Sequence, residues 1–411
     1  MNKRILILCE AIAPPAYSPR IITLVEYLQK HGWQCCIITE MDNDTPLPIT
    51  PLLITHYPLP ITQYTIHQMP TYRNLIADKL FGAKEKALAA FAEKQVDIAS
   101  FDLILCASYY YFPLQAANLL AQRYHKPLII DLRDIAEQWG QLDYYTRSFT
   151  GIPFVDTIAK RLYTYINNHQ RNRALRAAQA VTTVSPWHQQ LLAQYNPSTH
   201  LIYNGFDDET FVAQDLPTQR FDITFMGKYY AHYHDCPKLL FAALRNLIVK
   251  GEIEQKHIGV HFYTNPQGQQ AFAQLAQQYT LEDLVEVHDY IPRSELVNKM
   301  HQSSILLVLT TSAKLHGTHG IMGTKFYEIL GVEKPCLCLT SDDDCLAATI
   351  QQTHAGLAAH NVEEVEAFVL DKYHEWQQNG YTHQQVTNKQ HFTRQYEAKQ
   401  FEQLFIETLK H

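Results

Sequence analysis

Short apolar runs recur along the chain and alternate with longer amphipathic segments. Each run has the length of a buried strand, and those at 5–9, 305–309 and 336–339 are apolar throughout, as in a parallel sheet covered on both faces. The runs lie at 5–9, 34–39, 102–107, 127–131, 180–184 and 200–203, and then at 221–227, 258–263, 285–288, 305–309 and 336–339. The pattern predicts an α/β protein built of strand–helix–strand units.

The strand pattern stops and then restarts in the middle of the chain, which predicts two domains. We expect a Rossmann-like N-terminal domain at 1–207, a polar linker at 208–220, a second Rossmann-like domain at 221–388 and a C-terminal helix at 389–411. Two such domains imply a cleft between them, the usual place for a small ligand.

Two segments of the first half carry less information. Residues 43–75 are rich in proline and threonine and weakly patterned, with one strand expected at 52–56. Residues 83–94 are expected to form an exposed helix.

The stretch at 316–340 reads as a strand end, a glycine-rich loop, a helix and a strand. Gly317, Gly320 and Gly323 let the backbone approach a ligand closely. Thr324 is the expected N-cap of a helix beginning at Lys325, so the free N–H groups and the dipole of that helix point at the loop. This arrangement predicts an anion site.

Lys325 and Glu328 are three residues apart and therefore share one face of this helix. A cation and a carboxylate beside an anion-binding turn suit a phosphorylated sugar or a nucleotide. The alternative is that Glu328 only complements the helix dipole and that Lys325 is a solvated side chain.

Composition and charge narrow the class of protein. The net charge of −7 and a pI near 6.3 exclude a general nucleic-acid binder, which needs a basic surface. The eight cysteines show no C-x-x-C spacing and lie mostly in apolar runs, so we expect a reduced, cytoplasmic setting. No stretch reaches the roughly 18 apolar residues of a membrane-spanning helix.

One segment departs from the acidic average. No acidic residue lies between Asp156 and Asp207, and a long helix expected at 157–179 carries five cations, which are Lys160, Arg161, Arg171, Arg173 and Arg176. This helix predicts peripheral contact with an anionic membrane surface. A solvated basic face that packs on its own domain is the alternative.

Several motifs, taken in order and spacing, resemble the GT-B glycosyltransferases, in particular the large retaining family of bacterial surface-polysaccharide assembly. They are a Pro-Pro loop at 14–15 leading to Arg20, Asp-Leu-Arg-Asp at 131–134, 181–185, 202–207, Phe-Met-Gly-Lys at 225–228, and 323–330 before Lys-Pro at 334–335.

The resemblance implies two Rossmann-like domains facing across a cleft, with the last helix crossing back to the first domain. It also implies a nucleotide sugar bound by the second domain, with Glu328 on the ribose hydroxyls. Many relatives have a further glutamate eight positions before this one, where the present chain has Gly320. This departure leaves the donor sugar open.

The leaving nucleoside diphosphate builds up negative charge that must be neutralised. Asp342, Asp343 and Asp344 lie at an expected helix start, where acids act as caps, and the segment at 232–236 (His-Tyr-His-Asp-Cys) offers no second pair of ligands at zinc spacing. We therefore expect metal-independent neutralisation by Lys228, Lys325 and the helix near Thr324, with no cofactor.

We therefore interpret the protein as a glycosyltransferase of the hexosyltransferase type, and the resemblance implies that it retains the anomeric configuration. It is expected to move a sugar from a nucleotide diphosphate donor to a glycan or lipid-linked acceptor in cell-surface polysaccharide synthesis. It is expected in the cytoplasm, peripheral at the inner face of the membrane. The donor residues are Gly227, Lys228, Gly320, Gly323, Thr324, Lys325 and Glu328; the acceptor side has Arg20, Arg133 and Asp134; the catalytic candidates are Asp134, Lys228 and Lys325. A sugar-nucleotide epimerase and a catalytically silent subunit of the same fold are the alternatives.

Overall fold

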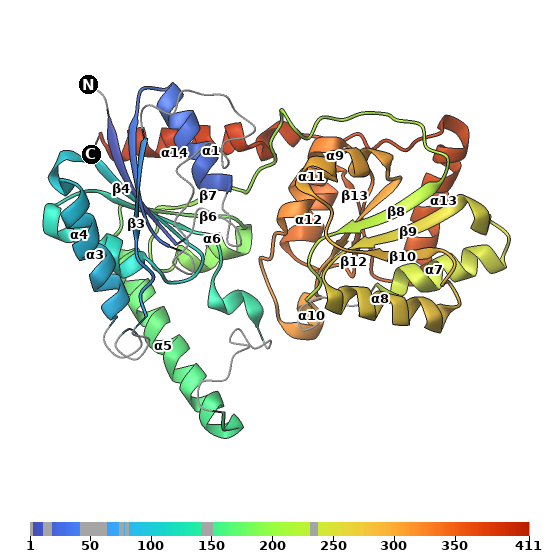
Figure 1. Ribbon diagram of the computed structural model, residues 1–411, viewed down its shortest axis with the longest axis horizontal. Helices are drawn as coiled ribbons and strands as arrows, with labels where there is room; N and C mark the ends of the chain where they lie inside the picture. The colour runs from blue at the N-terminus through green and yellow to red at the C-terminus, as the bar shows by residue number, and fades with distance from the viewer. Residues whose placement is uncertain are drawn as a thin grey trace. The chain divides into compact units, whose positions relative to one another are not determined.

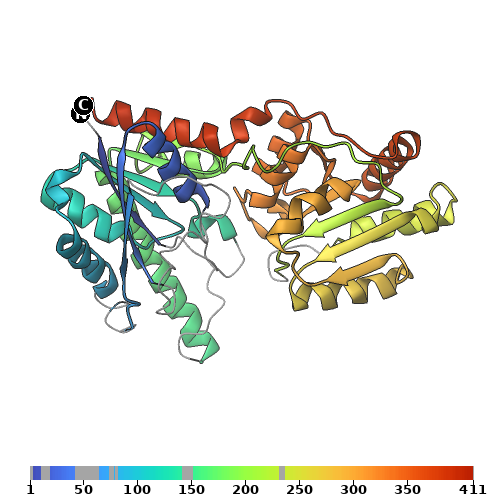
Figure 2. The same cartoon turned by 45° about the horizontal axis from the view of Figure 1, so that its top comes forward.

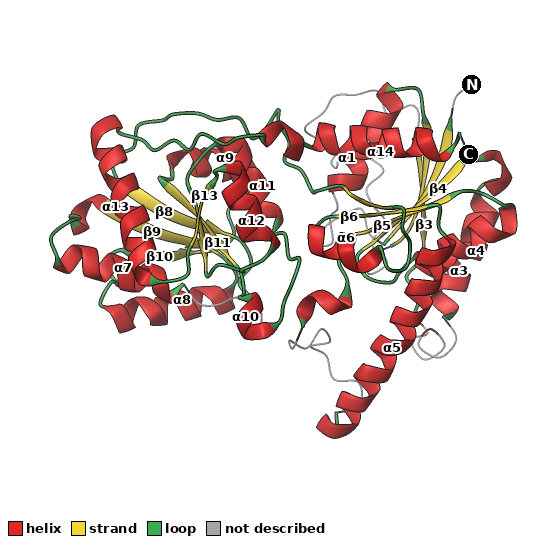
Figure 3. Ribbon diagram, turned by 180° about the vertical axis from the view of Figure 1, so that it is seen from behind, coloured by secondary structure: helices red, strands yellow, loops and turns green. Residues whose placement is uncertain are grey.

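The computed structural model describes residues 3–10, 19–41, 64–73, 78, 82–140, 151–230 and 237–410. The chain divides into two compact units. Unit 1 comprises Met1–Ala136, Tyr144–Tyr203 and Arg394–His411, and unit 2 comprises Glu137–Asp143 and Asn204–Thr393. In each unit, helices cover both faces of a parallel sheet (Figures 1 and 3). The predicted α/β class is confirmed.

The sheet of unit 1 has seven parallel strands in the order β3-β2-β1-β4-β5-β6-β7. Its central strands are buried on both faces, which explains their continuous apolar sequence. The strands are β1 Arg4–Cys9, β2 Gln34–Glu40, β3 Tyr64–Met69, β4 Leu103–Ser108, β5 Leu128–Leu132, β6 Ala180–Thr183 and β7 Thr199–Leu201. The sequence pattern does not predict β3, and the strand expected at 52–56 lies outside the described residues.

The helices of unit 1 are α1 Pro19–Lys30, α3 Ala83–Gln95, α4 Leu114–Tyr124, α5 Pro153–Ala177, α6 Pro186–Leu192 and α14 Arg394–Thr408, with short 3-10 turns η2 Ile98–Ser100 and η3 Ala136–Trp139. The last helix, α14, belongs to unit 1 and runs alongside α1, as Figure 2 shows. Trp33 fixes this contact, because its indole N–H donates to Glu402 at 3.0 Å and its ring meets Phe405 edge-on. The expected return of the C-terminal helix is confirmed.

The sheet of unit 2 has six parallel strands in the order β10-β9-β8-β11-β12-β13. Its strands are β8 Phe221–Met226, β9 Ile258–Tyr263, β10 Val285–His288, β11 Ile305–Leu309, β12 Cys336–Leu339 and β13 Gly356–Ala358. Its helices are α7 Lys238–Val249, α8 Pro266–Tyr279, α9 Arg293–Gln302, α10 Ala313–His316, α11 Thr324–Val332, α12 Cys345–Thr353 and α13 Val362–Asn379, with η4 Gln255–His257 and η5 Lys389–Phe392. Among the described segments, no helix combines the length and hydrophobicity that crossing a bilayer requires.

The division between the units differs in detail from the predicted boundaries. The stretch at 208–220, expected to be a linker, packs on unit 2. Phe211 is buried against Gly331, and the indole N–H of Trp376 donates to the Thr218 hydroxyl at 3.0 Å. Residues 389–393 also belong to unit 2, where Phe206 pairs with Thr393. The polar composition of 208–220 does not reveal this packing, because the segment contacts unit 2 through only a few residues, Phe211 and Thr218 among them.

Candidate functional site

The glycine-rich loop leads into α11 as predicted, but the helix begins one residue earlier. Gly323 is the N-cap and Thr324 is the first helical residue, so the assignment of Thr324 as the cap is wrong. Glycine has no side chain, so the N-cap residue makes no side-chain hydrogen bond to the first turn of α11. The space around the Gly323 Cα is open. The first N–H groups of a helix have no intrahelical acceptor, so this end offers donors to an anion.

Lys325 and Glu328 form an ion pair in the first turn and a half of α11. The Lys325 ammonium donates to Oε2 of Glu328 at 2.6 Å. The carboxylate is 15% exposed and the ammonium-bearing side chain is 40% exposed. The two residues therefore share a face, as their spacing predicts, and they engage each other there.

Gly320 has a backbone conformation that explains why the chain carries glycine at this position. Its φ is +70°, and its N–H donates to Oδ2 of Asp344 at 2.6 Å. A residue with a side chain costs about 1–2 kcal/mol in this left-handed region. The loop is thus built around a glycine at the position where the family resemblance leads us to expect glutamate.

The same loop is held from two further sides. The N–H of His319 donates to the Gln138 carbonyl at 2.9 Å, and its Nδ1 lies 3.4 Å from Oδ2 of Asp344. Gly140 packs so closely on Gly317 that a Cβ at position 140 would lie 2.0 Å from the Gly317 carbonyl oxygen. The loop is therefore fixed by side chains and backbone of unit 2 before any ligand binds.

Gly227 and Lys228 lie at the carboxyl end of β8, the edge at which open α/β sheets bind ligands. The N–H of Gly227 donates to the Tyr263 carbonyl at 3.0 Å. Lys228 is exposed, and its ammonium lies 4.7 Å from the centre of the Tyr230 ring. The loop that carries Gly320 and Gly323 follows β11, the neighbour of β8, so it leaves the sheet at the same edge.

The three aspartates at 342–344 have structural partners. Asp342 accepts from the N–H groups of Leu346 and Ala347 at 3.0 and 2.8 Å, which confirms that it caps the start of α12. Asp343 pairs with Lys314 and His360. The other metal candidate, the segment at 232–236, lies outside the described residues.

Arg20, an acceptor-side candidate, is buried in unit 1. Its guanidinium binds Asp131 through two hydrogen bonds of 3.0 Å and lies 3.2 Å from a carboxylate oxygen of Glu397. It also donates to the Tyr203 carbonyl at 2.9 Å. Arg20 therefore joins α1, β5 and α14, and its role toward an acceptor stays a prediction.

Arg133 and Asp134 follow β5 at the carboxyl edge of the first sheet. The guanidinium of Arg133 lies over the Tyr109 ring, 3.8 Å from its centre, and the Asp134 N–H donates to the Tyr109 carbonyl at 3.0 Å. This edge also holds Glu10, which follows β1 and accepts from the Tyr109 N–H at 3.2 Å.

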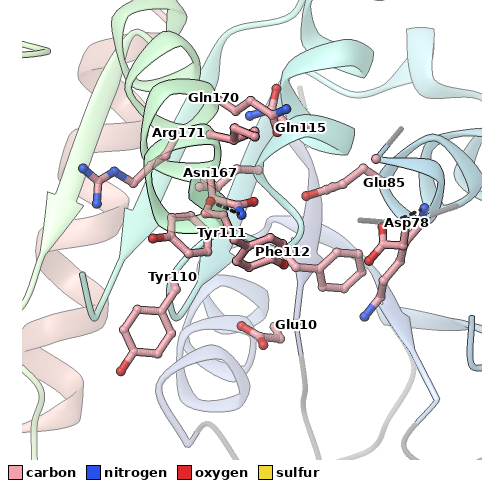
Figure 4. A pocket seen from close by; sticks show the side chains of 15 residues that line it. Glu10, Asp78, Glu85, Tyr110, Tyr111, Phe112, Gln115, Asn167, Gln170 and Arg171 are labelled. Atoms are coloured by element: carbon pink, nitrogen blue, oxygen red, sulfur yellow. Dashed lines mark hydrogen bonds between the residues drawn. The ribbon is translucent and has the colours of Figure 1, made fainter. Parts of the chain in front are cut away.

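A pocket of about 380 Å³ opens beside Glu10, and sequence reasoning missed it. Figure 4 shows the Phe112 side chain between the carboxylates of Glu10 and Glu85 in this view. Burial raises the pKa of both carboxyls, that of Glu85 to about 8. The remaining lining includes Lys84, Tyr110, Tyr111, Gln115, Tyr163, Asn167 and Arg171. The position of Glu10 directly after a strand could have signalled it, but Glu85 lies in a helix that looks exposed from its sequence.

Comparisons with known proteins agree with the fold. A sequence model of glycosyltransferase family 4 matches residues 19–210, which span most of unit 1. HepE of Anabaena, solved with UDP and glucose, is similar with a TM-score of 0.61 and 13% identity, covering 99% of this chain and 100% of HepE. Sucrose-phosphate synthase of Thermosynechococcus elongatus has a TM-score of 0.62 and 15% identity, with 98% and 99% covered. No curated protein matches the sequence significantly.

Two further solved structures are similar. S. aureus MnaA, solved with UDP, has a TM-score of 0.52 and 13% identity, covering 100% of this chain and 98% of MnaA. The lipopolysaccharide outer core galactosyltransferase WaaB has a TM-score of 0.59 and 11% identity, with 98% and 99% covered. These similar structures confirm the expected fold, GT-B, and the match to the glycosyltransferase family 4 model covers residues 19–210 of the chain.

Proposed function

We propose that the protein is a glycosyltransferase that takes a hexose from a nucleoside diphosphate donor, with retention of configuration, and passes it to a glycan or lipid-linked acceptor of a cell-surface polysaccharide. The observation that carries the proposal is the glycine-capped start of α11 beside the Lys325–Glu328 pair. HepE of Anabaena, which has a similar fold, was solved with UDP-glucose, and WaaB is a lipopolysaccharide galactosyltransferase.

In this proposal the diphosphate binds the N–H groups at the start of α11, and Glu328 accepts hydrogen bonds from the ribose hydroxyls. Lys325 and Lys228 neutralise the charge that grows as the sugar–phosphate bond breaks, so the transfer itself uses no metal. The ion pair supports this arrangement because Lys325 can move from the carboxylate of Glu328 to a phosphate oxygen within the reach of its flexible stem.

We propose that the acceptor is bound by unit 1, through Arg133 and Asp134 at the carboxyl edge of its sheet. The pocket lined by Glu10 and Glu85 adjoins this edge through Tyr109, whose N–H binds Glu10. Aromatic rings and carboxylates are groups that suit a sugar, with its apolar ring faces and its hydroxyl donors.

We further propose that α5 meets the membrane that carries a lipid-linked acceptor. The helix begins four residues earlier than expected, at Pro153, and its first half extends beyond the rest of unit 1 in Figure 1. Phe154, Leu162 and Tyr165 are 75%, 57% and 70% exposed. Arg171, one of the five expected cations, is instead buried, so the exposed apolar residues and Arg161 carry the contact.

Product analysis with a panel of UDP- and GDP-sugars tests the reaction. A transferase forms a glycosylated product only when an acceptor is present. The epimerase alternative would convert the sugar nucleotide without an acceptor, and one structure of similar fold is described as a UDP-N-acetylglucosamine 2-epimerase from Listeria monocytogenes. Nucleotide binding with neither reaction, across the panel and with lipid-linked acceptors, would indicate a silent subunit and overturn the proposal.

A further inference from the structure

A cluster of metal-ligating side chains lies on unit 2, on strands β9 and β10. His261 and Glu286 are direct partners in the pairing of these strands, and His288 follows two residues after Glu286 on the same face. Val260 and Phe262, which alternate with His261 along β9, point to the opposite face and belong to the hydrophobic core. The three polar side chains therefore converge outside that core. We propose that they bind a divalent transition-metal ion, with Zn²⁺ as the best fit.

The distances between the ligand atoms support a metal better than they support hydrogen bonds. Nδ1 of His261 lies 3.5 Å from Oε2 of Glu286 and 3.4 Å from Nε2 of His288. The Oε2 atom of Glu286 and the Nε2 atom of His288 are 3.5 Å apart. Good hydrogen bonds between such groups measure about 2.7–3.2 Å. A tetrahedral zinc site with bonds of about 2.1 Å has edges of about 3.4 Å between its ligand atoms. The three atoms thus form one face of such a tetrahedron.

The surroundings of His261 supply the outer contacts that a metal-bound histidine needs. Its side chain is 7% exposed, and its second ring nitrogen, Nε2, faces Oδ1 of Asp222 at 3.3 Å. Both atoms are buried, and neither completes a hydrogen bond within the described part of the chain. In metal sites, a carboxylate in this position accepts the other N–H of the histidine and orients the ring. Metal binding at Nδ1 would fix the tautomer that carries the proton on Nε2.

The other two ligands are also oriented by neighbours. The His288 ring stacks on Tyr263 with centroids 4.5 Å apart. A guanidinium nitrogen of Arg220 lies 3.7 Å from Oε1 of Glu286, the oxygen that does not face the histidines. His288 and Glu286 are 33% and 48% exposed, so an ion can enter from solvent and keep a water as its fourth ligand. The ion would tie β10, the edge strand of the sheet, to β9 and through Asp222 to β8.

This site does not depend on the proposed transferase chemistry. The cluster shares no residue with the donor candidates Gly227 and Lys228, which follow the end of β8, although the Gly227 N–H donates to the carbonyl of Tyr263, whose ring stacks on His288. Its test can therefore rest on metal binding and stability alone.

The experiment titrates Co²⁺ and Zn²⁺ into the metal-free full chain. We expect one Co²⁺ per chain with the intense visible absorption of tetrahedral Co²⁺, displaced by Zn²⁺. His288→Ala should weaken Zn²⁺ binding at least a hundredfold, and Asp222→Asn should weaken it by roughly 10- to 100-fold. His288 is partly exposed, so its replacement should leave the fold intact, which a melting curve checks.

His383→Ala is the matched control, because His383 is also a partly exposed histidine of unit 2 that pairs with a carboxylate, Asp215, at 3.0 Å. It should bind Zn²⁺ as the wild type does. If His288→Ala and Glu286→Gln bind Zn²⁺ as tightly as the wild type, the ion sits elsewhere and the proposal is wrong. Absence of stoichiometric binding in the wild type at millimolar metal would also overturn it.

Discussion

The ammonium of Lys325 donates to the carboxylate of Glu328 at 2.6 Å, in the opening turns of the helix that follows the glycine-rich loop. This contact places a cation and an anion where the donor's phosphates and ribose are proposed to bind. Without a ligand, Glu328 already accepts a hydrogen bond from Lys325. Its contribution to the free energy of nucleotide binding is therefore the gain from the ribose hydroxyls minus the loss of this ion pair.

Replacement of Glu328 by glutamine should weaken UDP binding by roughly ten- to a hundredfold. A charge-assisted hydrogen bond contributes roughly 1.5–3 kcal/mol, and each 1.4 kcal/mol is a factor of ten. If Glu328 serves only the helix dipole, the variant should instead lose about 0.3–1 kcal/mol of stability with its affinity intact. Calorimetric titration and a melting curve for each protein separate these outcomes.

The control for this variant is Glu375→Gln. Glu375 forms the same kind of pair, three residues after Lys372 in α13 and at 2.9 Å, with 23% exposure. It should change the melting temperature to a similar extent and leave UDP affinity unchanged. A loss of UDP affinity in this control would show that the effect of Glu328→Gln comes through stability.

Gly320→Ala and Gly323→Ala should differ in their effect on stability. Position 320 has φ +70°, so alanine there should cost about 1–2 kcal/mol. Position 323 has φ −62° with open space around the Cα, so alanine there should cost about 0.5 kcal/mol as a poorer N-cap. Denaturant unfolding of the two variants measures both values. Equal stabilities would mean that the loop can adopt another conformation at 320.

Gly320→Glu introduces the residue that the family resemblance leads us to expect at this position. Gly320→Glu should destabilise the loop at least as much as alanine does, since the N–H of residue 320 must still reach Asp344. It should therefore lower donor turnover. A gain of turnover would contradict the view that this loop is built around glycine.

The free energy of unfolding should fall as pH rises from the ordinary pKa of a glutamate, 4.5, to the raised pKa of Glu85 in the folded protein, about 8. Burial raises the pKa of Glu85 from 4.5 to about 8, so the folded protein retains a proton that the unfolded chain releases at lower pH. Between these values the free energy of unfolding should decrease with pH, by up to about 1.4 kcal/mol per pH unit for one proton.

Glu85→Gln should remove this part of the slope while keeping an oxygen that accepts from the Ala116 N–H. Urea unfolding at several pH values between 5 and 8 provides the measurement. Glu282→Gln removes an exposed carboxylate of unit 2 and controls for net charge. An unchanged slope in Glu85→Gln would mean that Glu85 is not the group that holds the proton.

Vesicle sedimentation should detect binding of the chain to anionic membranes through α5. Arg161→Ala should weaken it about fivefold, since one basic residue near the surface contributes about 1 kcal/mol. Phe154→Ser should weaken it further by removing an exposed apolar ring. Val249→Ser, which removes another exposed apolar side chain at the end of α7, should have no effect. Binding that ignores both salt and anionic lipid would refute the membrane contact.

Chelation should lower the stability of the zinc-loaded protein and leave sugar transfer unaffected. EDTA should leave sugar transfer intact at temperatures where the protein stays folded, because lysines and N–H groups are proposed to neutralise the diphosphate. It should also lower the melting temperature of the zinc-loaded protein, because an ion bound only to the folded state stabilises it by mass action. Loss of transfer at a temperature far below unfolding, with rescue by Mg²⁺ or Mn²⁺, would contradict metal independence.

The sequence by itself determined the α/β class and the positions of most strands. Continuous apolar runs mark strands that are buried on both faces, so β1, β4, β5 and β11 could be located from hydrophobicity alone. The spacing of Lys325 and Glu328 likewise gave their shared face, because contacts within one helix depend only on its local geometry.

Only the tertiary structure decided which distant side chains meet. The partners Arg20 and Asp131 lie 111 residues apart, and His261 and Glu286 are brought together by the register of β9 and β10. A shift of one residue in that register would turn the whole strand over, so no local pattern encodes the meeting. Burial acts in the same way on Glu85, since its raised pKa arises from neighbours that fold around it from α4 and α5.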